Sequence, residues 1–407
     1  MEDKAVQTMT KKKIAFLSLS VVLLITLLTG ALFGQTTQKS SVYRYLSIFS
    51  EVFDLVKTNY VDQVGPEKLM DGAFAGVTDA IDEFSYYVPA NQMPAYKKFT
   101  DIEDNGLGVI VTKRFGYAYV VAPVEGSPAD QAGLDSGDFI EKIDGQPTQT
   151  MTAWQMRAAI NQPRPVKLLI LRGGETHREE VTIKPASFHP VTVQNDTISG
   201  IAYVKIPWFE PGTAQQFRAA LESLRQKGAR KLIIDLRGNA GGSVEEAITS
   251  ADELLTSGLI TALEGRKIEE KKWQADRNTS YDGEVQVLTD PSTAAGAEVF
   301  ASAIHGNGRG KVVGLTTYGK AIVQKFIPLP SGGGVQMTIG HYTTPELKAI
   351  TDAGVKPDVL VDLSAQALEE PEAKGKREPK DDLILNKALQ LFGAQPQGTK
   401  VAEKKAA

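Results

Sequence analysis

The sequence of 407 residues contains no cysteine and only four histidines. Without cysteine, the chain has no disulfide, no zinc–thiolate site and no cysteine nucleophile. The histidines lie far apart and show neither an HExxH pattern nor a paired spacing, as is typical of surface or core residues: His177, His189, His305 and His341. We therefore expect no metal, no cofactor and no histidine-based catalytic triad.

Clustered charge is also missing. The 45 basic and 49 acidic residues give a net charge of −4, and the lysines and arginines are scattered along the chain. A nucleic-acid-binding protein would carry a basic patch or stripe, so we expect no nucleic-acid partner. The composition, 42% hydrophobic and 23% charged, is that of an ordinary globular protein, and the length allows two or three domains. No internal repeat is found.

One long uncharged run is present, from Ile14 to Phe33, and Lys11, Lys12 and Lys13 precede it. The run is long enough to cross the roughly 30 Å of a bilayer core, and the lysines should keep residues 1–13 in the cytoplasm. A cleaved signal peptide would have a shorter apolar region and an A-x-A-like cleavage site. We favour a retained single transmembrane helix over a cleaved signal. In either case we expect the body of the protein to lie outside the cytoplasm, in the periplasm or the extracellular space.

Residues 36–100 are predicted to be a helical segment. After a polar stretch from Gln35 to Ser41, large apolar residues recur at three- and four-residue steps, which is the spacing of a helix face: Tyr45, Leu46, Phe49, Val52, Phe53, Val56 and Tyr60. A second helical pattern runs from Pro66 to Ile81.

Residues 101–188 read as a small β domain. Apolar strands are predicted at Gly106–Val111 and Val120–Val124, a helix at Trp154–Ile160, and closing strands at Val166–Leu171 and Glu179–Ile183. Between the second strand and the helix, Pro128 suits the first turn of a short helix, Gly133 its end, and Asp144-Gly145 a tight turn between strands. This arrangement resembles a PDZ domain.

The PDZ resemblance implies a binding activity. Such domains add an extended peptide as a strand to a sheet edge, while backbone N–H groups of a Gly-rich loop hold the terminal carboxylate. Here the candidate loop is Gly106, Leu107, Gly108 and Val109, and the expected partners are protein or peptide C-termini. The alternative is that these glycines only allow a tight entry into the strand.

Residues 191–364 are predicted to form an α/β core. A strand at Gly200–Ile206, a helix at Thr213–Lys227 and a buried strand at Lys231–Leu236 indicate a βαβ unit. A strand at Val285–Leu288, a helix at Ala297–His305 and a strand at Val312–Gly314 extend it. The charged tail, residues 365–407, is expected to lack fixed structure, with a docked helix over Asp382–Phe392 as an exception left open.

Three short motifs in this core carry chemistry. Asp235–Gly242 is a Gly-rich turn after the buried strand, where a missing Cβ permits close approach of a peptide carbonyl. Ser292–Val299 precedes a helix. Thr317–Lys320 ends in a lysine among apolar residues. Such surroundings should lower the pKa of the lysine, so that its amine can be neutral and act as a base.

Together these motifs resemble the carboxyl-terminal processing peptidases, or tail-specific serine proteases, and the resemblance extends from about Tyr43 to Val361. It implies a ClpP/crotonase-like α/β peptidase core with an inserted or preceding PDZ domain, acting by a Ser-Lys mechanism on C-terminal regions of proteins. It places Ala295 at the nucleophile position, Lys320 as the base and Gln324 as the residue that orients its amine. Its oxyanion-hole candidates are Gly241, Gly242 and Gly296. A homodimer through the N-terminal helices is a further implication.

The departure from the family pattern is Ala295, because alanine has no group that attacks a carbonyl. A deliberate serine-to-alanine inactivation, a natural relative that binds without cutting, and transfer of the role to Ser292 or Thr293 are the three explanations. The two hydroxyl residues are also ordinary helix-start residues. The alternative to a peptidase is therefore an inactive adaptor that holds tails in its PDZ groove.

Overall fold

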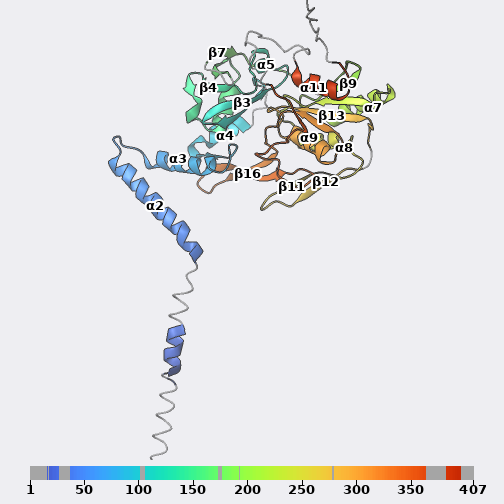
Figure 1. The fold of residues 1–407 in the computed structure, drawn as a ribbon. Coiled ribbons are helices and arrows are strands. Elements are labelled where there is room, and N and C mark those ends of the chain that lie inside the picture. Colours follow the sequence, from blue (N-terminus) through green and yellow to red (C-terminus); the bar gives the residue numbers. More distant parts are fainter. Residues whose placement is uncertain are drawn as a thin grey trace, which may run out of the picture. The chain divides into compact units, whose positions relative to one another are not determined.

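The computed structural model describes residue 16 and residues 18–26, 37–100, 106–172, 177–191, 193–276, 279–363 and 382–395. The chain divides into two compact units, residues 1–74 and 75–407 (Figure 1). The predicted cytoplasmic residues 1–13, half of the predicted anchor and most of the charged tail lie outside the described residues.

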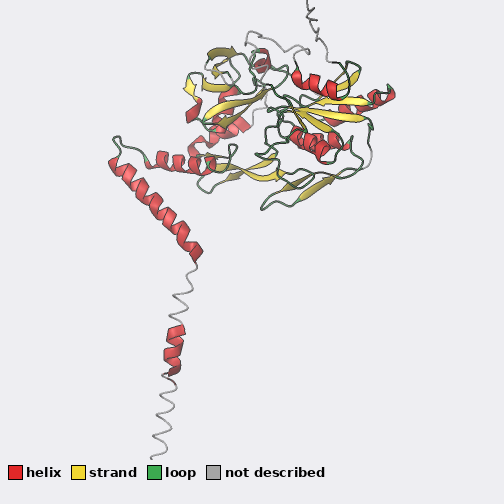
Figure 2. Cartoon of the chain, in the orientation of Figure 1, coloured by secondary structure: helices red, strands yellow, loops and turns green. Residues whose placement is uncertain are grey.

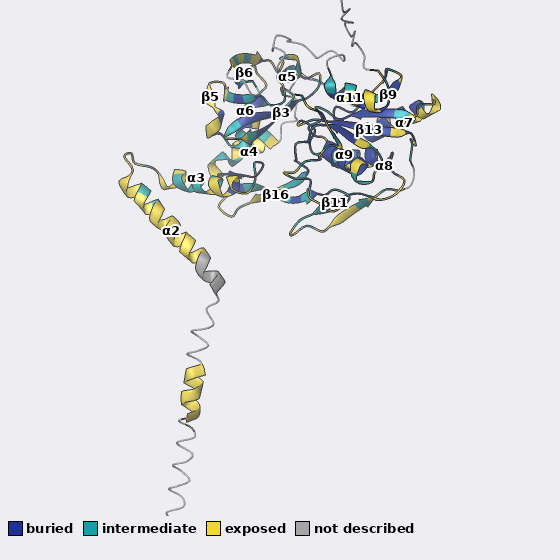
Figure 3. Cartoon of the chain, in the orientation of Figure 1, coloured by how far each residue is buried: buried dark blue, intermediate teal, exposed yellow. Residues whose placement is uncertain are grey.

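The first unit is helical. The predicted helical patterns are confirmed as α2 (Thr37–Asn59) and α3 (Pro66–Asp79). Helix α2 begins within the polar stretch from Gln35 to Ser41, and the end of α3 belongs to the second unit. Residues 18–26 of the predicted anchor are helical and exposed. No helix within the described ranges is both long and apolar enough to cross a membrane. Figure 3 shows that most of the described surface of α2 is exposed.

The second unit contains a sheet with the order β2-β3-β4-β6-β7, in which β5 pairs with β4. Its strands are β2 (Val109–Arg114), β3 (Tyr117–Pro123), β4 (Phe139–Ile143), β5 (Gln146–Pro147), β6 (Val166–Leu171) and β7 (Arg178–Ile183). Alternate residues of β6 (Val166, Leu168 and Ile170) are fully buried, as expected of a sheet with one covered face. The predicted turn is confirmed, since Asp144 and Gly145 both have positive φ (50° and 81°) between β4 and β5.

Two helices accompany this sheet, α5 (Pro128–Gln131) and α6 (Ala153–Ile160). Ser127 caps α5 by accepting a hydrogen bond from the Asp130 amide, and Pro128 occupies its first turn. A short 3₁₀ turn, η2 (Thr148–Thr150), precedes α6. In this sheet β2 is the outer strand, with β3 as its partner, so that one edge of β2 is not paired with another described strand.

The predicted α/β core is a six-stranded sheet with the order β17-β14-β13-β10-β9-β8. The strands are β8 (Gln194–Ile198), β9 (Ile201–Lys205), β10 (Lys231–Asp235), β13 (Glu284–Thr289), β14 (Lys311–Gly314) and β17 (Val359–Leu360). Only the β8–β9 pair is antiparallel. The apolar runs of β10 and β13 are buried on both faces, as a parallel sheet covered by helices requires.

Helices cover both faces of this sheet (Figures 1 and 2). One face packs against α7 (Thr213–Gln226), α8 (Val244–Asp252) and α9 (Gly296–Gly306). The other face packs against α11 (Leu383–Leu391), which confirms the docked helix left open for Asp382–Phe392.

A third sheet, which the sequence did not predict, has the order β1-β16-β11-β12, with β15 paired to β16. Its strands are β1 (Tyr86–Val88), β11 (Leu259–Glu264), β12 (Lys271–Gln274), β15 (Ile322–Pro328) and β16 (Gly334–Tyr342). Between β1 and the PDZ-like sheet lie η1 (Ala90–Gln92) and α4 (Met93–Thr100). This sheet matters for the site because β1 and β15 bring residues 83–88 beside residues 318–324.

Candidate active site

The Gly-rich turn follows β10 directly and lies against the loop after β9. A Cβ at Gly241 would lie 2.9 Å from the ring of Trp208. Gly242 has φ 103°, and a Cβ there would collide with the Phe209 carbonyl. The Phe209 carbonyl instead accepts a hydrogen bond from the Ser243 amide at 2.7 Å. Glycine is therefore required for the two loops to pack this closely.

Ala295 lies at the start of α9 and has an unusual backbone, with φ 53° and ψ −117°. Residues with a Cβ rarely adopt positive φ, and such strain costs about 1–3 kcal/mol. Two contacts hold the segment: the Ala294 amide donates to the Asn239 carbonyl at 2.8 Å, and the Ala295 amide donates to Glu298 Oε2 at 3.0 Å. The turn at Ala295 is thus tied to the Gly-rich loop on one side and to its own helix on the other.

Lys320 extends from the loop before β15. Burial, and to a smaller extent the nearby Arg157 charge, lower the pKa of Lys320 to about 8, although Glu83 and Glu298 act in the opposite direction. Its Nζ lies 5.0 Å from the centre of the Phe84 ring, a cation–π distance. Within the described residues, this amine forms neither a hydrogen bond nor an ion pair. A substantial neutral fraction at pH 8 makes Lys320 chemically suitable as a base.

Gln324 is not hydrogen-bonded to Lys320 in the described part of the chain. Its amide nitrogen donates to the Phe84 carbonyl at 2.8 Å. A register irregularity between Val323 and Gln324 interrupts the β15–β16 pairing there, and such bulges redirect side chains. Gln324 is thus bonded to the backbone of the residue whose ring faces the Lys320 amine.

Glu298 is the residue whose importance sequence reasoning missed. Its carboxylate is fully buried and accepts hydrogen bonds from the amides of Ala295, Gly319 and Lys320 and from the Thr317 hydroxyl, at 2.5–3.0 Å. Burial raises the pKa of Glu298 to about 7 even though these four donors act in the opposite direction. In the sequence it was visible only as an acidic residue in the first turn of a helix. In the fold it joins the turn at residue 295 to the loop at residue 320.

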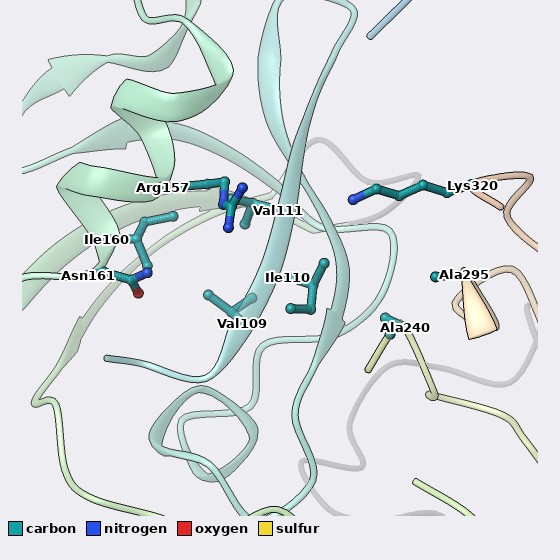
Figure 4. Close-up of a pocket in the computed structure, with 10 residues that line it drawn as sticks. Val109, Ile110, Val111, Arg157, Ile160, Asn161, Ala240, Ala295 and Lys320 are labelled. Carbon is teal, nitrogen blue, oxygen red and sulfur yellow. The ribbon is translucent and has the colours of Figure 1, made fainter. Parts of the chain in front are cut away.

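A cavity of about 190 Å³ lies between the α/β core and the PDZ-like part of the second unit, which consists of the sheet β2–β7 with α5 and α6. From the core it is lined by Ala240, Gly241, Ala295 and Lys320, and from the PDZ-like part by Val109, Ile110, Val111, Arg157, Ile160 and Asn161 (Figure 4). Of the predicted oxyanion-hole residues, only Gly241 lines the cavity, whereas Gly242 and Gly296 do not. Of the predicted catalytic set, Ala295 and Lys320 line it and Gln324 does not.

The two alternative nucleophiles lie outside the cavity lining. Ser292 and Thr293 have exposed fractions of 3% and 0%. The Thr293 hydroxyl donates to the Leu236 carbonyl and lies 3.0 Å from Asp290 Oδ1, and Ser292 is also hydrogen-bonded to Asp290. Both side chains therefore stabilise the turn before α9 in the way that helix-start residues do.

The predicted carboxylate loop is buried at Gly106 and Leu107 and half-buried at Gly108 and Val109. Leu107 is fully buried, and a Cβ at Gly108 would lie 2.6 Å from the ring of Phe188. The Leu107 carbonyl accepts from the Ala129 amide, and the Gly108 carbonyl from the Val124 amide. Of the four loop residues, only Val109 lines the cavity. No group of acidic, histidine or cysteine side chains within the described residues could hold a metal ion.

Several known proteins are similar to this chain in sequence and in fold. The sequence model of peptidase family S41 matches residues 200–361, and that of the PDZ domain matches residues 119–172. The carboxy-terminal-processing protease of Bartonella bacilliformis is 28% identical over 418 residues, which cover 94% of this chain and 96% of that protein. The carboxy-terminal processing protease CtpA of Bacillus subtilis is 29% identical over 319 residues, covering 77% and 68%.

The solved structure of a photosystem II D1 C-terminal processing protease superposes with a TM-score of 0.62 at 23% identity, covering 78% of this chain and 92% of that one. The architecture is thus an S41 peptidase fold that carries a PDZ domain and N-terminal helices. The chain belongs to the S41 carboxy-terminal processing protease family with a PDZ domain.

Proposed function

We propose that this chain binds the C-terminal tails of proteins and that its Ser-Lys centre is complete except for the nucleophile. The observation that carries the proposal is the geometry at Ala295. A residue with a strained, positive-φ backbone lines the same cavity as Lys320 and the Gly-rich loop, yet its side chain is a methyl group. The scaffold of a serine peptidase is therefore combined with a centre that cannot form an acyl-enzyme.

The buried state of the neighbouring hydroxyls supports this proposal. Ser292 and Thr293 are engaged with Asp290, so neither could reach a bound peptide unless the turn before α9 rearranged. Loss of a catalytic serine typically lowers kcat by about six orders of magnitude. As written, the chain should therefore hold tails without cleaving them.

The test is hydrolysis of an unfolded protein with a free C-terminus. We expect no cleavage by the chain as written, cleavage by the Ala295→Ser variant, and none by the Ala295→Ser variant that also carries Lys320→Ala. Cleavage by the unaltered chain would redirect the assignment to Ser292 or Thr293. If no version cleaves although tails still bind, the chain is an adaptor, and a serine at residue 295 is not sufficient to restore catalysis.

We further propose that Ile14–Phe33 anchors the protein in a membrane with its body outside the cytoplasm. The support comes from the sequence, since three lysines precede a long uncharged run. Protease added outside intact cells or spheroplasts should digest the PDZ region. Protection of that region until the membrane is lysed would contradict the proposed topology.

Self-association through α2 is the last part of the proposal. Its apolar residues are exposed in the single chain, for example Leu46 (56%), Phe49 (41%) and Val52 (52%). Exposed apolar stripes on a helix commonly mark contact surfaces. Light scattering should report a dimer that Leu46→Glu converts to a monomer, and a monomeric unaltered chain would contradict this part.

A further inference from the structure

The amine of Lys320 lies in the cavity without a polar partner. Among the described residues it forms neither a hydrogen bond nor an ion pair, and it faces the Phe84 ring, whose centre is 5.0 Å from Nζ. The carboxylates that act on it are already engaged: Glu298 accepts four hydrogen bonds, and Glu83 accepts one from the Tyr318 hydroxyl at 2.6 Å. Neither of them lines the cavity. The nitrogen of Lys320 is therefore free to react with a small molecule that enters.

Lys320 is also easily deprotonated. Burial, and to a smaller extent the charge of Arg157, lower its pKa to about 8, against the effect of Glu83 and Glu298. Loss of water around the amine and a second cation nearby are two of the causes that turn lysines into nucleophiles in proteins. At about pH 8 roughly half of the Lys320 amines are neutral, compared with less than about 1% for a lysine of ordinary pKa. Lys320 is thus the nucleophile of this cavity.

The space next to the amine suits a small apolar electrophile. Six of the ten lining residues have apolar side chains: Val109, Ile110, Val111, Ile160, Ala240 and Ala295. Because residue 295 is alanine, it offers the amine no hydroxyl as a hydrogen-bond partner. A water molecule needs only about 10–15 Å³ of such free space, so about 190 Å³ also admits CO2, which is small and apolar. Neutral amines react with CO2 to form carbamates.

Arg157 supplies the partner that a carbamate needs. A carbamate carries a carboxylate, and a guanidinium binds a carboxylate through two parallel hydrogen bonds. Arg157 lines the cavity, and Figure 4 shows its side chain and that of Lys320 extending toward β2, one from α6 and one from the core. Among the described residues the guanidinium has no hydrogen bond or ion pair and faces the Phe99 ring at 5.5 Å. No acidic residue lines the cavity to compete for it.

We propose that Lys320 is a carbamylation site, at which the amine adds to CO2 and Arg157 holds the carbamate that forms. The nitrogen lone pair forms an N–C bond to the carbon of CO2, one C=O bond becomes the C–O⁻ of the carboxylate, and the amine passes one proton to water. Nothing is oxidised or reduced, and loss of CO2 reverses the step. The two cations of the cavity are thereby replaced by one anion and one cation. The site does not depend on the proposed tail binding.

The experiment traps the carbamate on the full chain. The protein is equilibrated at about pH 8 with isotope-labelled bicarbonate and the CO2 that it releases. A trialkyloxonium salt then converts carbamates to stable esters, and peptide mass spectrometry locates them. The peptide that carries Lys320 should hold at least about tenfold more trapped carbamate than the one that carries Lys142, because burial leaves more of the Lys320 amine neutral. Lys142 is exposed on β4 and does not line the cavity.

Variants test the two residues separately. Without trapping, carbon NMR should show a carbamate resonance that weakens in Lys320→Met. Arg157→Gln should lower the trapped carbamate at Lys320 at least about threefold, because the carboxylate loses its partner and more of the amine is protonated. Arg164→Gln is the matched control, since Arg164 is exposed, does not line the cavity and carries the same charge; it should leave the carbamate unchanged. Thermal melting of each variant checks folding, and the comparison of Lys320 with Lys142 depends on no variant.

Each outcome decides part of the proposal. A carbamate that is specific to Lys320 and decreases in Arg157→Gln supports it. No carbamate at Lys320 overturns it, and so does an amount equal to that at Lys142, which would mark the reaction as that of any surface lysine. A carbamate that persists undiminished in Arg157→Gln overturns the role of Arg157. Tail binding is measured with peptides, so none of these results bears on the proposed function.

Discussion

Ala295 has a backbone that is costly for any residue with a Cβ, and this cost can be measured. Its φ of 53° is strained for alanine but ordinary for glycine. We expect Ala295→Gly to raise the free energy of unfolding by about 1 kcal/mol, because relief of about 1–3 kcal/mol of strain exceeds the entropy that glycine adds to the unfolded chain. Urea denaturation measures the change.

Ala294→Gly is the matched control for this substitution. Ala294 is fully buried and does not have positive φ. Glycine there removes a buried methyl group and adds flexibility, so it should destabilise the protein by about 1 kcal/mol. Destabilisation by both substitutions would show that the turn at residue 295 is not strained.

The protonation of Lys320 predicts how an Ala295→Ser variant depends on pH. Burial and the Arg157 charge together lower the pKa of Lys320 to about 8, against the opposing effect of Glu83 and Glu298. A base must be neutral to accept a proton, so kcat/KM should rise with pH and level off above about pH 8. Adding Arg157→Gln removes a positive charge and should move the midpoint to higher pH. A midpoint that stays fixed or falls would exclude this coupling.

At the scale of elements, Glu298 connects α9 to the loop that carries Lys320. Glutamine at this position keeps one acceptor oxygen but presents an NH₂ group to donors, so at least one buried donor loses its partner. We expect Glu298→Gln to lower the free energy of unfolding by about 1–3 kcal/mol. Glu245→Gln, in the exposed first turn of α8, should change it by less than about 0.5 kcal/mol. Thermal or urea unfolding distinguishes the two, and equal effects would contradict the connecting role.

The elements that sequence predicted are those with local signals. The apolar run of β10 and the amphipathic pattern of α7 appear in the structure close to their predicted bounds. The third sheet escaped prediction because its strands find partners far along the chain, such as Tyr86 with Gln336, and because β15 and β16 are only partly buried. Without a local hydrophobic period, such strands give little signal.

In the candidate site, too, only the residues that belong to a local sequence motif were predicted. Motifs located Ala295, Lys320 and the Gly-rich turn, which lie together in the fold. Sequence could not show that Gln324 contacts Phe84, 240 positions away, or that Phe188 covers Gly108. These contacts depend on how distant loops pack, and the residue types involved carry no signature of their own.

For the whole molecule, the docked helix α11 is an integral part of the core. It follows a long segment outside the described residues, yet Leu389 is fully buried against the central sheet, whereas Leu391 in the same helix is 40% exposed. We expect Leu389→Ala to lower the free energy of unfolding by about 2–5 kcal/mol and Leu391→Ala by less than about 1 kcal/mol. Urea unfolding followed by tryptophan fluorescence compares them, and similar effects would show that α11 is not docked in solution.

An ion pair links this helix to the Gly-rich turn. Arg237 forms ion pairs with Asp235 at 2.6 Å and with Asp382 at 2.7 Å, and the Asp382 side chain also caps α11 by accepting from the Leu385 amide. The C-terminal helix α11 therefore stabilises the Gly-rich turn, which borders the cavity. It does so from the face of the sheet opposite to α7, α8 and α9.

The backbone at residue 295 also bears on the history of this chain. Alanine and serine codons differ by a single nucleotide, and the main chain already holds the turn, the buried Glu298 and the amine of Lys320 around that position. A serine there would line the same cavity as Lys320 and Gly241. If this chain binds tails as proposed and the Ala295→Ser variant cleaves them, one point mutation converts a tail-binding protein into a tail-cutting one, and one point mutation reverses the change.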